Sequence, residues 1–384
     1  MKTGKFVKLI PVLALATLLS GVTLTACNTV EEDEPCLNSS TFVGQSGARQ
    51  VLAVDLPFTP GPVAVLSSTQ GGQSLSRSGR LWLAESGTTL YALSGADVRA
   101  VDLATWEPST IASVGYRAAQ LAGSDRESTL LVTDHVRGSV WIVDSLCRTQ
   151  SVEVEVGRGA QSVAFGPGRR IAYVANEWDN TLSLVETGVG TYVSTDRRVV
   201  VAAQSEGKLL VLDGDGRVQK TFNDLPSQIL DIALLPGGDI LAVTYSEVVV
   251  TGEIDVAGDG KIVLSEGIAL LDLTSGEVTL HELERPDDAE LNELLARPTG
   301  MAVVDNGAHL VVALPGWGRV ALMDVNPESD TYGATLKTHA VPGNPSWVIA
   351  ASLADDWVYL LDDDTGAVVT LGKQGQVTKE ITLR

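Results

Sequence analysis

The stretch IAYVANEWDNTLSLVE, residues 171–186, contains two short apolar runs around a polar turn. The first run covers 171–175, and the turn at 176–180 is rich in Asn and Asp, which favour turns. In the second run, Leu182 and Leu184 have the two-residue spacing of a half-buried strand. The stretch is therefore predicted to form a β-hairpin.

Similar hairpins recur along the chain. They begin near residues 80, 129, 170, 198, 239, 309 and 356. The intervals average roughly 46 residues, which is the length of one four-stranded propeller blade. Short apolar strands precede several hairpins and polar-alternating strands follow, as expected for inner and outer strands of a blade. The sequence predicts an all-β, seven-bladed β-propeller of four-stranded antiparallel blades over residues 49–384, with six blades as the alternative.

Two intervals are irregular. The step from 170 to 198 leaves little room for the inner strand of the fourth blade, for which only 191–195 is available. The step from 239 to 309 is long, and it indicates an insertion at 246–266 between two strands of the fifth blade.

The hairpin at 171–186 also resembles a known repeat. Its YVAN at 173–176 and NTLSLVET at 180–187 are similar to the YVTN type of β-propeller repeat. The match is close in this copy, and the other copies keep only the hydrophobic pattern and the turn. The resemblance implies an architecture over about 50–384, and such propellers serve as binding scaffolds, cell-surface proteins and occasionally enzymes.

The N-terminus has the pattern of an export signal. Lysines at positions 2, 5 and 8 precede an apolar run at 9–22, which is shorter than the ~20 residues of a spanning helix. Leu24-Thr25-Ala26-Cys27 then resembles a bacterial lipobox. We expect 1–26 to be a lipoprotein signal peptide and Cys27 to carry the lipid. Asn28 after it resembles outer-membrane sorting in a Gram-negative cell.

Residues 27–48 are predicted to be a flexible tether. The acidic run at 31–34 is followed by Ser, Thr, Gly and Gln, so little apolar surface can be buried. The expected location is extracytoplasmic, with the protein anchored to the bacterial envelope by its lipid.

Charge and cysteine content limit the partners. The 384 residues include 27 Lys plus Arg and 48 Asp plus Glu, and the predicted signal peptide removes three of the lysines. So acidic a chain repels phosphate backbones, which excludes nucleic acid, and it attaches to a membrane through lipid rather than charge. Cys36 and Cys147 remain as a candidate disulfide pair in an exported protein. A monomer is expected.

The loops between second and third strands open on one face of a propeller, together with the interblade connections. Exposed Trp and Arg residues on such loops are typical of recognition surfaces. The alternative for each residue is a turn cap or a packing contact. The candidate binding face consists of Glu85, Asp134, His135, Arg137, Glu177, Trp178, Asp179 and Trp317.

Residues 255–266 have the twelve-position frame of an EF-hand calcium loop. Calcium prefers oxygen ligands at alternating positions and a final bidentate carboxylate. Ala257 replaces the third ligand and the flanks read as strands, so a long β-hairpin is the alternative. No other cofactor is expected. The candidate calcium ligands are Asp255, Asp259, Ile262 and Glu266.

Sequence signatures of enzymes are missing. There is no Gly-x-Ser-x-Gly, His-Glu-x-x-His, phosphate loop or Cys-x-x-Cys, and no catalytic residue is predicted. The chain is expected to be a binding scaffold for a protein or small molecule. A lactonase-like hydrolase, with carboxylates converging on the channel around a metal such as calcium, is the alternative.

Overall fold

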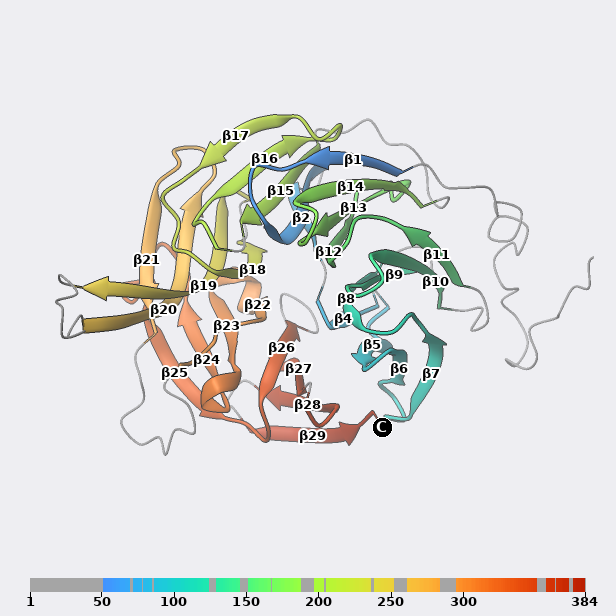
Figure 1. Ribbon diagram of the computed structural model, residues 1–384. Helices are drawn as coiled ribbons and strands as arrows, with labels where there is room; N and C mark the ends of the chain where they lie inside the picture. The colour runs from blue at the N-terminus through green and yellow to red at the C-terminus, as the bar shows by residue number, and fades with distance from the viewer. Residues whose placement is uncertain are drawn as a thin grey trace, which may run out of the picture.

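The chain folds into a ring of seven β-sheets around a central axis (Figure 1). In the computed structural model the described residues are 51–69, 72–77, 79–84, 86–123, 129–145, 151–166, 168–187, 197–203, 205–235, 238–251, 261–283, 295–350, 357–362, 364–372 and 376–383. The predicted seven-bladed, all-β propeller is confirmed, and the six-bladed alternative is wrong. Over these residues the helical elements are the 3-10 turns η1 (Asp305–Gly307) and η2 (Pro315–Trp317), and no helix there could span a membrane.

We number the blades around the ring. Blade 1 contains β4 (Leu81–Leu83), β5 (Thr89–Ser94), β6 (Asp97–Asp102) and β7 (Pro108–Ser113). Blade 2 contains β8 (Ala118–Gly123), β9 (Thr129–Asp134), β10 (Ser139–Asp144) and β11 (Ser151–Glu155). Blade 3 contains β12 (Ala160–Phe165), β13 (Ile171–Asn176), β14 (Thr181–Glu186) and β1 (Val51–Asp55). Blade 4 contains β2 (Pro60–Thr69), β3 (Gly72–Arg77), β15 (Arg197–Ala203), β16 (Leu209–Asp213) and β17 (Val218–Phe222).

The remaining three blades follow the chain without interruption. Blade 5 contains β18 (Ile229–Leu234), β19 (Ile240–Thr251), β20 (Lys261–Asp272) and β21 (Val278–Glu282). Blade 6 contains β22 (Met301–Val304), β23 (His309–Leu314), β24 (Arg319–Asp324) and β25 (Thr335–Ala340). Blade 7 contains β26 (Pro345–Ala350), β27 (Trp357–Asp362), β28 (Ala367–Gly372) and β29 (Val377–Thr382).

The N-terminal strands complete two blades in the middle of the chain. β1 pairs with β14 as the outer strand of blade 3, and β2 pairs with β15 as the inner strand of blade 4. The expectation that 191–195 supplies this inner strand is wrong. The interval from 170 to 198 is short because the outer strand of blade 3 and the inner strand of blade 4 come from the beginning of the sequence.

Strand β3 lies on the channel side of β2. The strand order of the sheet is β17-β16-β15-β2-β3, and β3 also approaches β12 and β18, the inner strands of the two neighbouring blades. From β3 the chain crosses the interior of the ring to blade 1 (Figure 1). The N-terminal segment therefore occupies part of the channel.

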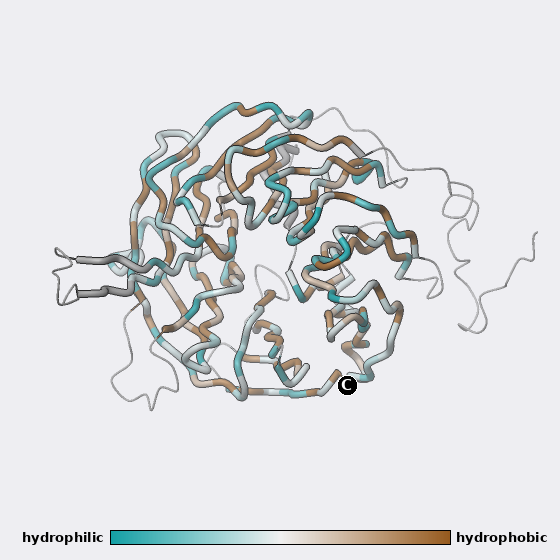
Figure 2. Tube along the Cα trace, in the orientation of Figure 1, coloured by the Kyte–Doolittle hydropathy of each residue, from teal (hydrophilic) through white to brown (hydrophobic). Residues whose placement is uncertain are grey.

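Seven apolar clusters form the core, one between each pair of neighbouring blades. Apolar residues concentrate along the inner strands and polar residues toward the rim (Figure 2). In β14, Leu182 and Leu184 face blade 4, whereas Val185 faces blade 2. The half-buried strand predicted for this run is thus wrong, because both of its faces are covered by a neighbouring blade.

Side-chain hydroxyls connect the inner parts of adjacent blades. Thr133 Oγ1 donates to the carbonyl oxygen of Gln161 (3.1 Å), and Thr244 Oγ1 donates to that of Thr299 (3.3 Å). The Val63 amide donates to Ser162 Oγ across the junction of blades 3 and 4 (3.0 Å). These bonds satisfy buried polar groups that the hydrogen bonds within each sheet do not.

The ring closes between blades 7 and 1 without a shared strand. An apolar cluster that includes Leu90 and Leu361 fills this junction. On the rim, Lys379 Nζ lies 4.4 Å from the centre of the Trp106 ring, and the Trp106 and Tyr359 ring centroids are 6.2 Å apart. Side-chain packing, not strand pairing, therefore holds this junction.

Acidic residues end the third strands of six blades, and those of blades 1, 4, 5 and 6 cap the turns that follow. Asp102 Oδ1 accepts hydrogen bonds from the amides of Ala104 (2.7 Å) and Thr105 (3.0 Å). Asp272 Oδ1 accepts from the amides of Thr274 (2.7 Å) and Ser275 (2.9 Å). These backbone hydrogen bonds hold the pKa of both carboxyl groups below the usual Asp range. The six residues are Asp102, Asp144, Glu186, Asp213, Asp272 and Asp324.

Replacing two of these caps is expected to matter only when they are charged. A folded-state pKa below the unfolded value stabilises the protein above about pH 4, and this contribution is lost as pH falls through the folded pKa. The D102N/D272N variant should unfold at lower denaturant than the parent at pH 6, and the difference should shrink at about pH 2–3. Urea titrations at both pH values test this, and a difference independent of pH would contradict it.

Candidate functional site

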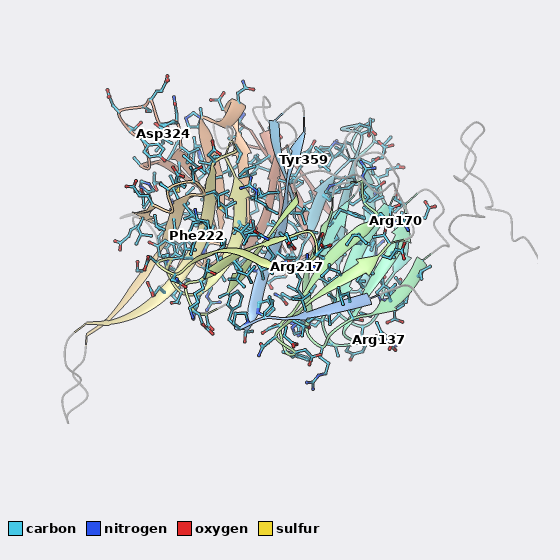
Figure 3. The ribbon with its side chains drawn as sticks, turned by 90° about the horizontal axis from the view of Figure 1, so that it is seen from above. Arg137, Arg170, Arg217, Phe222, Asp324 and Tyr359 are labelled. Carbon is cyan, nitrogen blue, oxygen red and sulfur yellow. The ribbon has the colours of Figure 1, made fainter. Side chains whose placement is uncertain are left out.

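Six of the eight predicted binding residues lie on one face of blades 2 and 3. In each blade the second strand runs antiparallel to the inner strand, so it ends where the inner strand begins. The turns between second and third strands therefore share a face with the interblade connections. We call this the lower face, since Arg137 marks it at the bottom of Figure 3.

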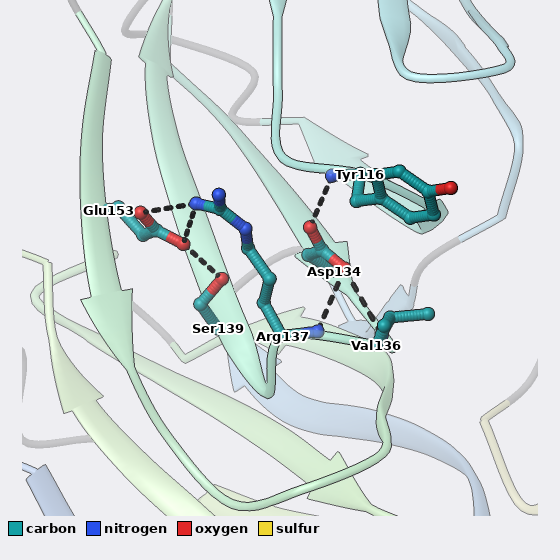
Figure 4. A network of polar contacts seen from close by, with 6 residues as sticks. All are labelled: Tyr116, Asp134, Val136, Arg137, Ser139 and Glu153. Atoms are coloured by element: carbon teal, nitrogen blue, oxygen red, sulfur yellow. Dashed lines mark hydrogen bonds and ion pairs between the residues drawn. The ribbon is translucent and has the colours of Figure 1, made fainter.

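Asp134 organises the turn between β9 and β10. Its carboxylate is fully buried and accepts hydrogen bonds from three backbone amides: Tyr116 N to Oδ2 (2.6 Å), and Val136 N and Arg137 N to Oδ1 (3.1 Å each) (Figure 4). Arg137 in turn pairs with Glu153 across the blade (3.3 Å). Asp134 thus fixes the positions of its neighbours and is not itself accessible to a ligand.

His135 and Glu177 connect blade 2 to blade 3. His135 Nε2 lies 2.8 Å from Glu177 Oε2, and the His135 ring meets the Trp178 ring edge-on with centroids 4.5 Å apart. These contacts hold the Trp178 ring beside the neighbouring turn.

Arg158 and Asp179 fix the next connection. Asp179 accepts from the Arg158 amide at Oδ2 and from Arg158 Nε at Oδ1, both at 2.7 Å. The Arg158 amide, followed by its side chain, lowers the pKa of the Asp179 carboxyl. The Trp178 amide donates back to the Arg158 carbonyl oxygen (3.1 Å). The Arg158 guanidinium is held through Nε, and its side chain remains 75% exposed.

Glycine is required where these segments touch. Gly159 has φ +74°, and a Cβ there would lie 2.7 Å from the Trp178 backbone nitrogen. Gly138 has φ +68°, and a Cβ there would lie 2.9 Å from the Gly157 carbonyl oxygen. Side chains at either position would clash with backbone and require a left-handed conformation that they rarely adopt.

Exposed apolar and basic side chains project from these connected turns. Tyr116, Val136 and Trp178 are 79%, 47% and 52% exposed. Three exposed arginines accompany them, two directly following an apolar residue in sequence. We call this set the arginine–aromatic surface, and its members are Tyr116, Arg117, Val136, Arg137, Arg158 and Trp178.

Four members of this surface were not predicted from the sequence. Tyr116, Arg117 and Arg158 lie in interblade connections, and Val136 lies beside predicted turn residues. One sequence feature could have identified the interblade connections: both begin with Val-Gly, as VGYR at 114–117 and VGRG at 156–159.

The other two predicted face residues are treated separately. Glu85 lies outside the described residues, and its place on the binding face stays a prediction. Trp317 is in η2, on the lower face of blade 6, where its ring is half-buried and packs against the cluster between blades 5 and 6.

The predicted calcium loop is an extension of one long hairpin. β19 and β20 pair continuously from Ile240 with Asp272 to Thr251 with Lys261, and the ribbon projects from the ring (Figures 1 and 3). Its strand flanks agree with the hairpin alternative. Asp255 and Asp259 lie outside the described residues, and Ile262 lies in β20.

Glu266 is already engaged within the fold. Its side chain is 9% exposed and accepts from Ser246 Oγ (3.0 Å), Ala296 N (2.5 Å) and Arg297 N (2.9 Å). Across the described residues, no group of three or more acidic, His or Cys side chains is arranged to hold a metal. Calcium binding by this loop stays a prediction. Cys27, Cys36 and Cys147 also lie outside the described residues.

The carboxylates of the inner strands serve structural bonds. Asp231 is 3% exposed; its Oδ1 accepts from the Ile232 amide (2.9 Å) and its Oδ2 from the Met301 amide of the next blade (3.0 Å). Asp305 pairs with His309 at the end of β22 (3.0 Å). Both carboxylates are therefore engaged in contacts within the fold.

Comparisons with known proteins support the fold. No protein-family model matches the chain, and no curated protein matches its sequence. Among solved structures, the chain is similar to hydrazine synthase of Kuenenia stuttgartiensis, with TM-score 0.62, 19% identity and coverage of 77% of this chain and 95% of that one. It is also similar to the β-propeller domain of Cps50 (Swd1) from Myceliophteria thermophila, with TM-score 0.55, 13% identity and coverage of 77% and 96%. Hsv2 of Kluyveromyces lactis gives TM-score 0.51, 11% identity and coverage of 79% and 98%. At such identities the likeness concerns the fold alone.

Proposed function

We propose that the protein is a binding module that recognises another protein through the arginine–aromatic surface. The observation that carries this proposal is the concentration of exposed Tyr116, Val136 and Trp178, with three arginines, on adjoining turns of one face. Aromatic residues and Arg are enriched at protein interfaces, and a few such side chains supply most binding energy. The other exposed large apolar residues lie on β1 and on the outer strands of blades 4 to 7: Leu52, Val218, Leu280, Leu336 and Val377.

Preorganisation supports the same function. The backbone of both recognition turns is fixed by the buried Asp134 carboxylate and by the contacts of His135 with Glu177 and Trp178. A surface that is already ordered loses less conformational freedom when it binds.

The proposal includes an anchor at the bacterial envelope. The lipobox-like segment ending at Cys27 would place the lipid at the start of the mature chain, and the YVTN-type resemblance is compatible with a cell-surface propeller. Mass spectrometry of the N-terminal peptide would detect acyl chains on Cys27, and an unmodified N-terminus would reject the anchor. The fold and the surface do not depend on this result.

A photo-crosslinking phenylalanine derivative at Val136 is expected to capture a partner in envelope preparations. The same derivative at Leu280, on the outer strand of blade 5, is the control site. Trp178→Ala should reduce the adduct at least about tenfold, because an exposed aromatic anchor is lost. Leu280→Ala is the matched control variant, since both parent side chains are 52% exposed. Equal capture from the two sites, or no effect of Trp178→Ala, would reject the proposed surface.

A further inference from the structure

We infer that the arginine–aromatic surface binds an extended acidic peptide segment that also carries apolar side chains. This inference rests on the proposed function and names the chemistry of the partner. Its two grounds are the guanidinium donors that remain available and the apolar residues that lie next to the arginines in sequence.

Arg137 and Arg158 each bind a single carboxylate and keep other guanidinium donors available. Arg137 contacts the Glu153 carboxylate through one terminal nitrogen, and Arg158 contacts Asp179 through Nε. Their side chains are 55% and 75% exposed, whereas those of Glu153 and Asp179 are 31% and 28% exposed. The acidic partners therefore lie deeper than the guanidinium groups. Arg117 is exposed as well.

Free guanidinium donors select an anionic ligand. Each group has five donors in a planar fork that matches a carboxylate. The whole chain is strongly acidic, with a net charge of −21, and the exposed guanidinium groups of this surface are cationic points on it. A short acidic segment can contact these arginines without also facing the acidic rest of the protein.

The spacing of the apolar residues favours a peptide. Tyr116 precedes Arg117 and Val136 precedes Arg137, and both pairs have their backbone fixed by Asp134. Trp178 lies on the neighbouring turn of blade 3, and its ring contacts His135, which precedes Val136 in blade 2. Side chains of an extended peptide alternate between two sides, so one segment can offer acidic and apolar groups in turn.

A membrane fits this surface less well. An extended anionic bilayer would face the whole lower side of the disc, and a chain of net charge −21 is repelled by it. The ribbon of β19 and β20 projects from the same side of the ring (Figure 3). A narrow linear ligand avoids both obstacles.

Binding of defined peptides tests the inference. The probes are fluorescein-labelled peptides of alternating Glu and Phe, of Gln and Phe, and of Glu and Ser. Fluorescence anisotropy with the purified chain should show the Glu/Phe peptide binding at least about tenfold more tightly than the other two, with affinity falling as salt rises.

Matched variants separate the surface from general charge. R117Q/R137Q/R158Q should weaken Glu/Phe binding at least about tenfold. R170Q/R217Q/K337Q removes the same charge from exposed residues elsewhere and should leave binding unchanged. Equal losses in both variants, or equal binding of the Gln/Phe peptide, would overturn the inference.

Other anions are included as competitors. Phosphatidylglycerol vesicles or polygalacturonate that displace the peptide at matched charge would assign the surface to a lipid or a glycan and overturn the inference. Crosslinking from Val136 that still depends on Trp178 would then leave the proposed protein-binding function intact. Loss of both results would reject the proposed function as well.

Discussion

Removal of residues 51–69 is expected to prevent the ring from forming. The deletion takes away the outer strand of blade 3 and the inner strand of blade 4. It also removes Val63 and Val65 from one apolar cluster and Leu66 from another, all about 1% exposed. Loss of each large aliphatic side chain costs about 1–5 kcal/mol, and the total approaches or exceeds the roughly 5–15 kcal/mol that keeps a domain folded. Circular dichroism and thermal unfolding measure the effect.

Two controls accompany this deletion. Removing residues 1–48 keeps all described strands and should preserve the unfolding transition. Adding a synthetic peptide of residues 49–71 to the deleted chain should restore it, because the empty strand positions are specific. A deleted chain that unfolds cooperatively at the parent temperature would show that the two strands are dispensable.

Asp134→Ala is expected to destabilise the protein and disable the surface together. The substitution leaves the amides of Tyr116, Val136 and Arg137 without their acceptor. An unsatisfied buried donor costs about 1–3 kcal/mol, and we expect a total on the order of 3 kcal/mol because the turn can relax toward water. Chemical denaturation gives the stability, and crosslinking from Val136 reports on the surface.

The comparison variant is Ser139→Ala on the same turn. Ser139 Oγ donates to Glu153 (2.8 Å) at the edge of the network, so its loss should cost about 1 kcal/mol or less. If Asp134→Ala unfolds at the same denaturant concentration as Ser139→Ala, the carboxylate does not organise these turns.

The sequence allowed the architecture to be predicted because hairpins repeat at the length of a blade. It did not allow the strand partners of 51–69 to be predicted, because an apolar segment does not indicate which distant edge it joins. The hairpin that begins near residue 80 was assigned to the second and third strands of its blade, whereas it consists of the first and second. A hairpin of first and second strands has the same local pattern as one of second and third strands, yet the two turn at opposite faces.

Two of the six residues of the arginine–aromatic surface could be anticipated from the sequence, and four could not. Trp178 and Arg137 lie in turns that the repeat marks clearly. Tyr116, Arg117 and Arg158 lie in connections between blades, whose spatial neighbours depend on how adjacent blades pack. His135 and Glu177 are 42 residues apart, and only the arrangement of blades brings them together.

The insertion of the N-terminal strands also has a consequence for biosynthesis. β1 and β2 leave the ribosome early, but they have no sheet to join until blades 3 and 4 exist; Thr59 bonds Asn180 across 121 residues. Contacts so distant in sequence slow folding and leave the edges of β14 and β15 open meanwhile. At high concentration a second chain can place its own strands there first. We therefore expect exchanged dimers as the main misfolded product, each ring completed by the other chain's first strands.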